Sequence, residues 1–271
     1  MASAERSRNA KMTKQLLRRA YHHSDFVIPS TFDIRHPSLA GRLIATRGQL
    51  AELIPQIEAA DRIALDTEAD SLHSYREKLC LIQISVPAVT GIVEAGRKQH
   101  GLGMERDRRS RLQRDFIVDP LRDLDLEPLR RALEAREIVL HGADYDLRML
   151  RRGLNFIARK IFDTVVAARL LGIREFSLRA LVKRYFGTEL PKGSQKANWA
   201  KRPLPARMAE YALNDVHYLL PLAKRLETEL DRHQRLDWFR QSCQRAIEQA
   251  ATARTRSQDE LTLAHPRCRR A

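Results

Sequence analysis

Apolar positions along this chain follow two different spacings, with the change near residue 144. Before it, short apolar runs rich in β-favouring residues predict strands, with helical segments placed among them. After it, apolar residues recur every three or four positions, as expected for helices with one buried face. The order predicts an α/β fold, a mixed β-sheet flanked by helices with a mostly helical C-terminal half.

Specific segments follow from this pattern, and no strand is expected after residue 144. Thr46 and Gln49 have the spacing of a capping box and start the first helix. The strands are expected at residues 62–66, 79–86, 116–119 and 136–143. The helices are expected at residues 46–60, 125–135, 146–154, 163–171, 177–187 and 206–233, the last as one long helix.

Composition narrows the class of partner and the compartment. The chain has 49 Lys and Arg against 34 Asp and Glu, a net charge of +15 at pH 7, which favours a polyanion such as nucleic acid. Its three cysteines have no paired spacing, so neither a disulfide framework nor a zinc site is predicted. No apolar run approaches the length of a membrane span, and the N-terminus has no apolar secretory core. We therefore expect a cytoplasmic protein that does not enter a membrane.

One large domain is expected between two polar ends. Residues 1–30 are predicted to form a basic N-terminal arm, with an organelle transit peptide as the alternative. Residues 31–248 form the predicted folded domain, and residues 249–271 a flexible basic tail. Residues 96–115 hold seven Lys or Arg against three acids without an apolar period, which predicts a basic loop insertion. This loop is either a solvated segment or an RNA-contacting flap.

Two carboxylates, Asp66 and Glu68, directly follow the apolar run of the first predicted strand. Side chains alternate along a strand, so both carboxylates are expected on the same face. Two like charges this close repel unless one takes up a proton or a cation lies between them. The pair is therefore either part of a metal site or the solvated end of a strand, and only partners elsewhere in the chain distinguish the two.

Further acidic groups lie at a strand-to-helix turn and on the last predicted helix. Asp144 suits the N-cap of the helix after the fourth strand, and Asp146 lies in its first turn, where the helix dipole favours an ionised carboxylate. Tyr211 and Asp215 are four residues apart and share one helix face. Each of these groups taken singly is explained by exposure to solvent, but chance is a poor explanation of the ordered set.

This ordered set resembles the Tyr subtype of the DEDD superfamily of 3′–5′ exonucleases, and within it the ribonuclease D family. The resemblance covers roughly residues 40–245. Asp66 and Glu68 match the first motif. Asp146 matches the second motif through its spacing of five from His141.

The third motif of the family is matched by Tyr211 and Asp215. Glu210, and not a histidine, lies five residues before Asp215, which disfavours the His subtype. The stretch 193–222, GSQKANWAKRPLPARMAEYALNDVHYLLPL, resembles ribonuclease D in its Trp and its Arg-Pro-Leu turn. The resemblance implies an RNase H-like fold and hydrolysis of single-stranded RNA 3′ ends, tRNA precursors among them, releasing 5′-phosphomononucleotides.

The four carboxylates of these motifs, Asp66, Glu68, Asp146 and Asp215, offer only oxygen ligands. Oxygen ligands suit Mg²⁺ or Mn²⁺ better than zinc, and two such ions meet the charge requirements of phosphodiester hydrolysis. In the resemblance these acids are catalytic together with Tyr211, which orients or helps deprotonate the attacking water. The ordinary tyrosine pKa near 10 favours the orienting role.

Other polar and aromatic residues receive structural or weaker roles. Lys196 and Arg202 flank Trp199 and are candidate nucleic-acid contacts, with solvated loop charges as the alternative. Trp199 is expected to pack beneath the loop before the third motif. Asp163 is expected to cap a helix, and His141 is assigned no catalytic role.

Two departures from the family bear on the substrate. The basic loop is longer than the usual link between these strands. Residues 249–271 are too few to form the helicase-and-RNase-D C-terminal (HRDC) domains of larger members, so we expect the chain to lack them and to hold RNA through its basic surface, loop or termini. Alternative functions are a 3′–5′ DNA exonuclease on the same fold and a catalytically silent nucleic-acid-binding module. The complete set of acids argues against the silent module, and protein partners are left open.

Overall fold

The computed structural model describes residues 42–71, 74, 77–87, 113–191 and 197–252. All of these residues lie in one compact unit, Arg35–Ala271, whereas the N-terminal unit, Met1–Ile34, falls outside the described residues. Among the described residues, no helix combines the length and the apolar character needed to cross a membrane.

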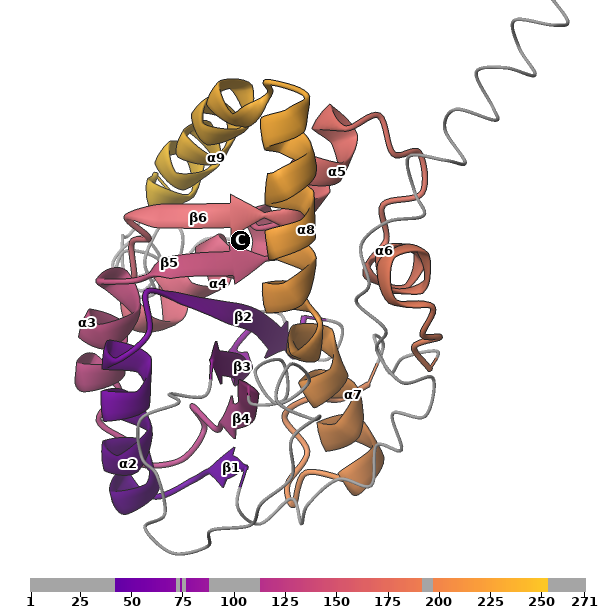
Figure 1. Cartoon of the computed structure of the whole chain (residues 1–271). Coiled ribbons are helices and arrows are strands. Elements are labelled where there is room, and N and C mark those ends of the chain that lie inside the picture. Colours follow the sequence, from indigo (N-terminus) through magenta and orange to yellow (C-terminus); the bar gives the residue numbers. More distant parts are fainter. Residues whose placement is uncertain (1–41, 72–73, 75–76, 88–112, 192–196, 253–271) are drawn as a thin grey trace, which may run out of the picture. The chain divides into compact units, whose positions relative to one another are not determined.

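A six-stranded mixed sheet lies at the centre of this unit, in the order β1-β4-β3-β2-β5-β6 (Figure 1). β3 pairs antiparallel with both β2 and β4, whereas the pairs β1–β4, β2–β5 and β5–β6 are parallel. β2 is therefore an interior strand, with a neighbour on each side. The strands are β1 (Leu43–Ile44), β2 (Arg62–Ala69), β3 (Leu79–Pro87), β4 (Gln113–Val118), β5 (Glu137–Leu140) and β6 (Lys160–Asp163).

Helices pack against this sheet and against one another. α7 packs across β2, β3 and β4, and α8 continues over β2 and β5, passing in front of the sheet in Figure 1. α4 contacts β2 and β3, and α9 packs against α4 and β6. The helices are α2 (Arg47–Glu58), α3 (Glu127–Glu134), α4 (Asp144–Leu154), α5 (Thr164–Leu170), α6 (Leu178–Phe186), α7 (Ala206–His217), α8 (Leu219–Arg232) and α9 (Leu236–Ala251).

Two apolar clusters join the layers. The larger one contains the buried residues of β2, β5 and β6 together with the apolar faces of α2, α3, α4, α8 and α9. The smaller one, called here the α7 cluster, lies between α7 and the β3–β4 part of the sheet. Its buried members are Cys80, Leu81, Ile117, Trp199, Leu204, Met208, Ala209, Ala212 and Leu213.

The predicted α/β class is confirmed, as are the elements with the clearest sequence signals. α2 begins after Thr46, whose side chain forms the predicted capping box with Gln49. The four predicted strands correspond to β2, β3, β4 and β5, and helices are present where α3, α4, α5 and α6 were expected. Cys80 is fully buried, as an apolar core residue would be.

Several sequence predictions of elements were wrong. β6 lies after residue 144, where only helices were expected, because four residues are too few to show a strand period and its position depends on pairing with β5. The two-residue β1 was also missed. The single helix expected at residues 206–233 is two helices, α7 and α8, separated at Tyr218, three residues before Pro221.

Segment boundaries differ from the sequence prediction at two further places. Residues 113–115, the last three of the predicted loop, belong to β4, because they pair with residues 85–87 of β3 and Asp115 is buried. α9 (Leu236–Ala251) was not among the expected helices, and its last residues, 249–251, belong to the predicted tail. The predicted arm at residues 1–30, residues 96–112 of the loop and the tail beyond residue 252 lie outside the described residues.

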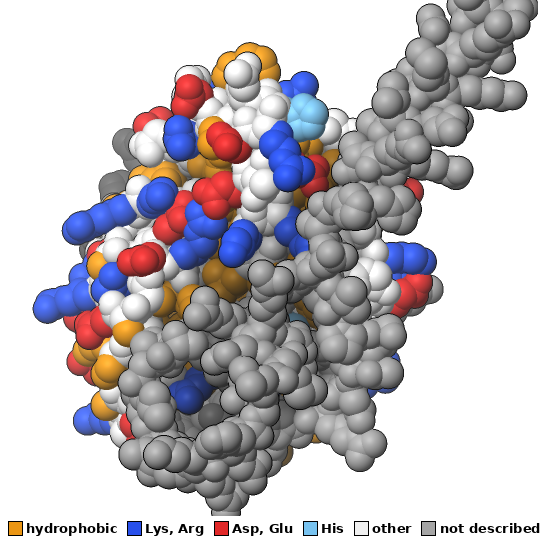
Figure 2. Space-filling model, in the orientation of Figure 1, with side chains coloured by type: hydrophobic (Ala, Val, Ile, Leu, Met, Phe, Trp, Pro, Cys, Tyr) orange, Lys and Arg blue, Asp and Glu red, His pale blue; other side chains and the backbone are white. Residues whose placement is uncertain are grey.

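In the described part of the face shown in Figure 2, Lys and Arg side chains do not gather in a single patch. Over α8 and α9, Lys and Arg side chains are interspersed with Asp and Glu side chains in the described part of this face. Among the described residues, the Arg62 guanidinium on β2 likewise pairs with acids, Glu137 and Glu227. Exposed pairs of opposite charge contribute little, so this described part of the face offers no concentrated positive patch to a polyanion.

Asp163 connects the two helices that follow β5 and β6. Its carboxylate accepts hydrogen bonds from the amides of Val165 and Val166 at the start of α5, which confirms its predicted role as a helix cap. It also accepts from the amides of Gly142 (3.0 Å) and Ala143 (2.9 Å) in the turn before α4. One buried carboxylate therefore satisfies backbone donors from two separate segments.

We expect Asp163→Ala to lower the free energy of unfolding by about 2 to 4 kcal/mol, because it leaves several buried amides without an acceptor. Urea denaturation followed by circular dichroism measures the change. Ser177→Ala is the matched control, since Ser177 caps only α6 and its loss should cost about 1 kcal/mol. Equal destabilisation by the two substitutions would contradict the double role of Asp163.

Candidate active site

Three carboxylates converge where β2 ends against α7. Asp66 and Glu68 lie on the same face of β2, as the alternation of a strand requires. Asp215 on α7 faces them, and one oxygen from each of the three residues lies within 4.8 Å of the others. The fold thus brings Asp215 to Glu68 and Asp66, which lie 147 and 149 positions earlier in the chain, and the three form a group that could hold a metal ion.

Asp146 approaches the same strand from the first turn of α4. Its Oδ1 accepts hydrogen bonds from the Thr67 amide (3.1 Å) and the Thr67 hydroxyl (2.6 Å), and the carboxylate is buried. It lies outside the group of three oxygens, but its charge acts on Glu68 and Asp215. Asp146 is therefore beside the group, at the positive end of the α4 dipole.

Thr67 is a site residue that the sequence prediction missed. As the residue between Asp66 and Glu68, it points to the opposite face of β2 and meets α4 there. A hydroxyl between two acids at the end of a strand was the only signal of this role, and it does not reveal that the partner lies 79 residues away. Thr67 fixes the distance between the first motif and Asp146.

α7 supplies a hydroxyl as well as a carboxylate. The Tyr211 hydroxyl is hydrogen bonded to Asp215, one helical turn further along α7. The Tyr211 ring lies 6.1 Å from the Trp199 ring, centroid to centroid, and Trp199 is buried as predicted. The phenol is thus held between an aromatic support and the carboxylate group.

Burial and mutual repulsion disfavour the ionised forms of these acids. Burial, followed by the charge of Asp215, raises the pKa of Asp66 well above its ordinary value, and burial together with Asp66 does the same for Asp146. The pKa of Glu68 rises to about 10, mainly through burial and then through Asp66, and burial raises that of Asp215 to about 7. Acids in this position gain most from a bound cation.

The donor set fits a hard divalent metal. Every candidate ligand atom is a carboxylate oxygen, which suits Mg²⁺ or Mn²⁺. The raised pKa values of Asp66 and Glu68, caused first by burial and then by the neighbouring acids, agree with this fit, because a positive charge among the acids would favour their ionised forms. Asp66, Glu68 and Asp215 are the residues that would hold the metal, with Asp146 next to them.

His141 has a structural environment. Its Nδ1 lies 2.8 Å from the Thr164 hydroxyl, which in turn donates to the Leu140 carbonyl. Burial lowers the pKa of His141 to about 4, so the ring is neutral at physiological pH. Asp144, expected as the N-cap of α4, is instead its first residue after Ala143 and pairs with Arg148 on the surface.

The two predicted nucleic-acid contacts have different outcomes. Lys196 lies outside the described residues. Arg202 is described, and its guanidinium binds Asp119 and three backbone carbonyls inside the protein. A phosphate contact by either residue stays a prediction, and the internal partners of Arg202 indicate another role for it.

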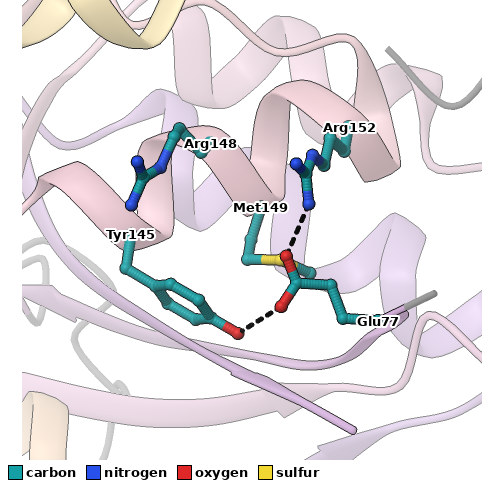
Figure 3. A pocket seen from close by; sticks show the side chains of 5 residues that line it. All are labelled: Glu77, Tyr145, Arg148, Met149 and Arg152. Atoms are coloured by element: carbon teal, nitrogen blue, oxygen red, sulfur yellow. Dashed lines mark hydrogen bonds and ion pairs between the residues drawn. The ribbon is translucent and has the colours of Figure 1, made fainter. Parts of the chain in front are cut away.

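A small pocket of about 100 Å³ lies along α4 (Figure 3). Tyr145 and Arg152 reach Glu77 from this helix: the Tyr145 hydroxyl donates at 3.1 Å and Arg152 Nη1 at 2.5 Å. Arg148 and Met149 complete the lining. Glu77 is thus already paired, which makes it a poor additional metal ligand.

Comparison with known proteins shows the family to which this sequence is related. The family model described as "3'-5' exonuclease" matches residues 42–231. Exosome complex component 10 of Mus musculus is 34% identical over 191 residues, covering 69% of this chain and 19% of that protein. Ribonuclease D of Zymomonas mobilis is 33% identical over 208 residues, covering 75% of this chain and 47% of that protein.

The solved structure of Escherichia coli RNase D, described as an exoribonuclease involved in structured RNA processing, has the same fold. It superposes with a TM-score of 0.63 at 26% identity, covering 78% of this chain and 50% of that one. The chain thus spans half or less of these relatives' length. All the candidate residues, from Asp66 to Asp215, lie within the matched range. The chain belongs to the 3′–5′ exonuclease family.

Proposed function

We propose that this chain is a metal-dependent 3′–5′ exoribonuclease of the ribonuclease D type. It hydrolyses RNA from an unpaired 3′ end and releases nucleoside 5′-phosphates. The observation that carries the proposal is the convergence of Asp66, Glu68 and Asp215 within 4.8 Å, with Tyr211 hydrogen bonded to Asp215. The ribonuclease D relatives support RNA as the substrate class.

The proposed cofactor is a pair of divalent metal ions, Mg²⁺ or Mn²⁺, held by Asp66, Glu68, Asp146 and Asp215. Such ions supply charge stabilisation at the phosphoryl group and the leaving oxygen, and make water more acidic. The chain itself supplies the oxygen ligands at fixed positions. Thr67 contributes by holding the Asp146 carboxylate against β2.

Tyr211 is proposed to orient the attacking water and not to remove its proton. Burial, followed by the charges of Asp215 and Glu68, raises the pKa of Tyr211 above its ordinary value, so the phenol keeps its proton. A protonated phenol that donates to Asp215 leaves its oxygen lone pairs available to accept a hydrogen bond from water. Because Tyr211 lies near the carboxylates, its hydroxyl can accept such a hydrogen bond from a water molecule at the site.

The proposed natural substrate is a tRNA-like RNA, and the proposed compartment is the cytoplasm. Maturation of tRNA-like 3′ ends and a cytoplasmic location both rest on the sequence and its resemblance to ribonuclease D. The alternative function is that of a DNA exonuclease with the same fold. Carboxylates and metals act on the phosphate and do not contact the 2′-hydroxyl, so they do not distinguish RNA from DNA.

Digestion of a 5′-labelled RNA with an unpaired 3′ tail tests the proposed function. In Mg²⁺ or Mn²⁺ we expect shortening by single nucleotides, and no shortening in EDTA or with Asp66→Ala. Denaturing gel electrophoresis of a time course measures the products. The DNA of the same sequence, in parallel and in competition, reports the sugar preference.

Each outcome of this digestion has a distinct meaning. Faster shortening of the DNA would replace the exoribonuclease with a DNA exonuclease. Binding of RNA without shortening in either metal would support the silent nucleic-acid-binding module. Full activity of Asp66→Ala would contradict the site itself.

Asp215→Asn and Tyr211→Phe should separate metal binding from orientation of the water. Asp215→Asn removes a charged ligand, so we expect metal affinity to fall by roughly tenfold or more together with activity. Tyr211→Phe removes only the hydroxyl, so kcat should fall by roughly ten- to a hundredfold with metal affinity almost unchanged. Calorimetric titration with Mn²⁺ and single-turnover kinetics measure the two effects. An equal loss of metal affinity in both variants would contradict the assigned roles.

Stability in EDTA should fall as the pH rises from 5 to 9. The pKa of Asp215 is raised from its ordinary 3.8 to about 7, and that of Glu68 from 4.5 to about 10. Because these folded-state values lie above the unfolded ones, their stabilising contribution is complete below about pH 4 and is lost as the pH passes through 7 and then approaches 10. Mg²⁺ binds the ionised forms, so the increase in Tm that it causes should grow over the same range.

Thermal melts in EDTA and in Mg²⁺ at several pH values measure this dependence. Asp215→Asn is the control, since it removes one of the titrating groups and should flatten the fall in Tm near pH 7. An Mg²⁺-induced increase in Tm that is independent of pH would contradict the raised pKa values.

A further inference from the structure

Arg202 uses every one of its N–H donors inside the protein. A guanidinium carries five such donors. Nε and Nη2 donate to the two carboxylate oxygens of Asp119, each at 2.7 Å. Nη1 donates to the carbonyls of Trp199 (2.7 Å) and Lys201 (2.8 Å), and Nη2 also donates to that of Cys80 (2.9 Å).

These bonds connect three segments that are distant in the sequence. Asp119 directly follows β4, Cys80 lies at the start of β3, and Trp199 and Lys201 belong to the segment that leads into α7.

The Asp119 side chain is 1% exposed and the Arg202 side chain 19%. Asp119 also accepts from the Leu121 amide (3.1 Å) and lies 3.4 Å from Arg122 Nε. Among the described residues, however, only Arg202 binds both of its carboxylate oxygens at 2.7 Å. A buried bidentate pair of this kind has fixed geometry, because moving either partner would leave desolvated donors or acceptors of the other without their hydrogen bonds.

The segment held by Arg202 forms the support of Tyr211. Trp199, whose carbonyl binds Arg202, is 1% exposed, and its ring faces Tyr211 at 6.1 Å. Only three residues separate Arg202 from the start of α7 at Ala206. The apolar α7 cluster packs the first turns of the helix onto the same strands that bind Arg202. The Asp119–Arg202 pair therefore holds in place the segment against which Tyr211 packs.

The geometry points to Arg202, paired with Asp119, as a positioning residue that sets the place of Tyr211 above the carboxylate group. The inference rests on the proposed function, since it concerns the orientation of the attacking water. Small displacements of a positioned group, of about 1 Å, cost on the order of a hundredfold in rate. Lysine cannot replace the guanidinium, because an ammonium has three donors and no planar fork.

Arg202→Lys and Asp119→Asn break the pair from its two sides. The second variant nearly keeps the shape of Asp119 and removes only the charge, which protects the test against a loss of folding in the first. Arg62→Lys is the matched control. Like Arg202, Arg62 is a mostly buried arginine in ion pairs, here with Glu137 and Glu227. Its side chain is 22% exposed, and it lies at the other end of β2 from the site.

Kinetics on the labelled RNA provide the first readout. We expect Arg202→Lys and Asp119→Asn to lower kcat about tenfold or more, with KM and Mn²⁺ affinity within about twofold, whereas Arg62→Lys keeps kcat. Because Arg202 acts through Tyr211, the double variant Arg202→Lys/Tyr211→Phe should be no slower than Tyr211→Phe alone. A reduction equal to the product of the two single effects would overturn the inference.

Trp199 fluorescence provides a readout that does not depend on activity. The chain has two tryptophans, and Trp238 on α9 is 61% exposed. In a Trp238→Phe background, emission therefore reports on Trp199 alone. We expect Arg202→Lys to shift this emission to longer wavelength while circular dichroism stays unchanged, and Arg62→Lys to leave it in place.

The remaining outcomes of these experiments also decide for or against the proposed role of Arg202. A raised KM with unchanged kcat would assign Arg202 to phosphate binding and overturn the inference. Global unfolding of both Arg202→Lys and Asp119→Asn would overturn it as well, because the pair would then support the fold as a whole. A wild-type chain that cleaves no nucleic acid would refute the proposed function separately, and the emission of Trp199 would still show whether Arg202 holds this segment.

Discussion

Crowding of acidic side chains at the end of a buried strand is the constraint on which this structure depends. Asp66, Glu68 and Asp215 place oxygens within 4.8 Å of one another, and burial adds to their repulsion. Left to themselves, such groups would move apart or take up protons. The surrounding fold must hold them in place, so that the acids are preorganised to bind a divalent cation.

Buried polar contacts provide that restraint at several places around the site. Thr67 holds Asp146 from the strand, and Asp163 holds the turn that starts α4. Arg202 and Asp119 hold the segment that starts α7. Each of these contacts is made through hydrogen bonds, which allow a buried polar group to stabilise a position. The two helices that bring acids to β2 are thus anchored close to their N-terminal ends.

The sequence predicted most of the fold because most elements carry strong local signals. The capping box of α2 and the apolar run of β3 are recognisable without tertiary context. β6 was missed because four residues show no period, and its extended conformation depends on pairing with β5. The break between α7 and α8 at Tyr218 was missed because the apolar spacing continues across it, although Pro221 lies just beyond.

The sequence alone determined which chemical groups are present and which of them share a face. Asp66 and Glu68 are side by side because strands alternate, and Tyr211 and Asp215 because helices repeat every 3.6 residues. Tertiary structure decided the pairs that cross the chain, such as Thr67 with Asp146, 79 residues apart, and Arg202 with Asp119, 83 residues apart. It also gave Arg202 an internal role where the sequence suggested a phosphate contact. The period of a strand or helix determines to which side each side chain points within that element. Contacts between elements depend instead on how their buried faces pack.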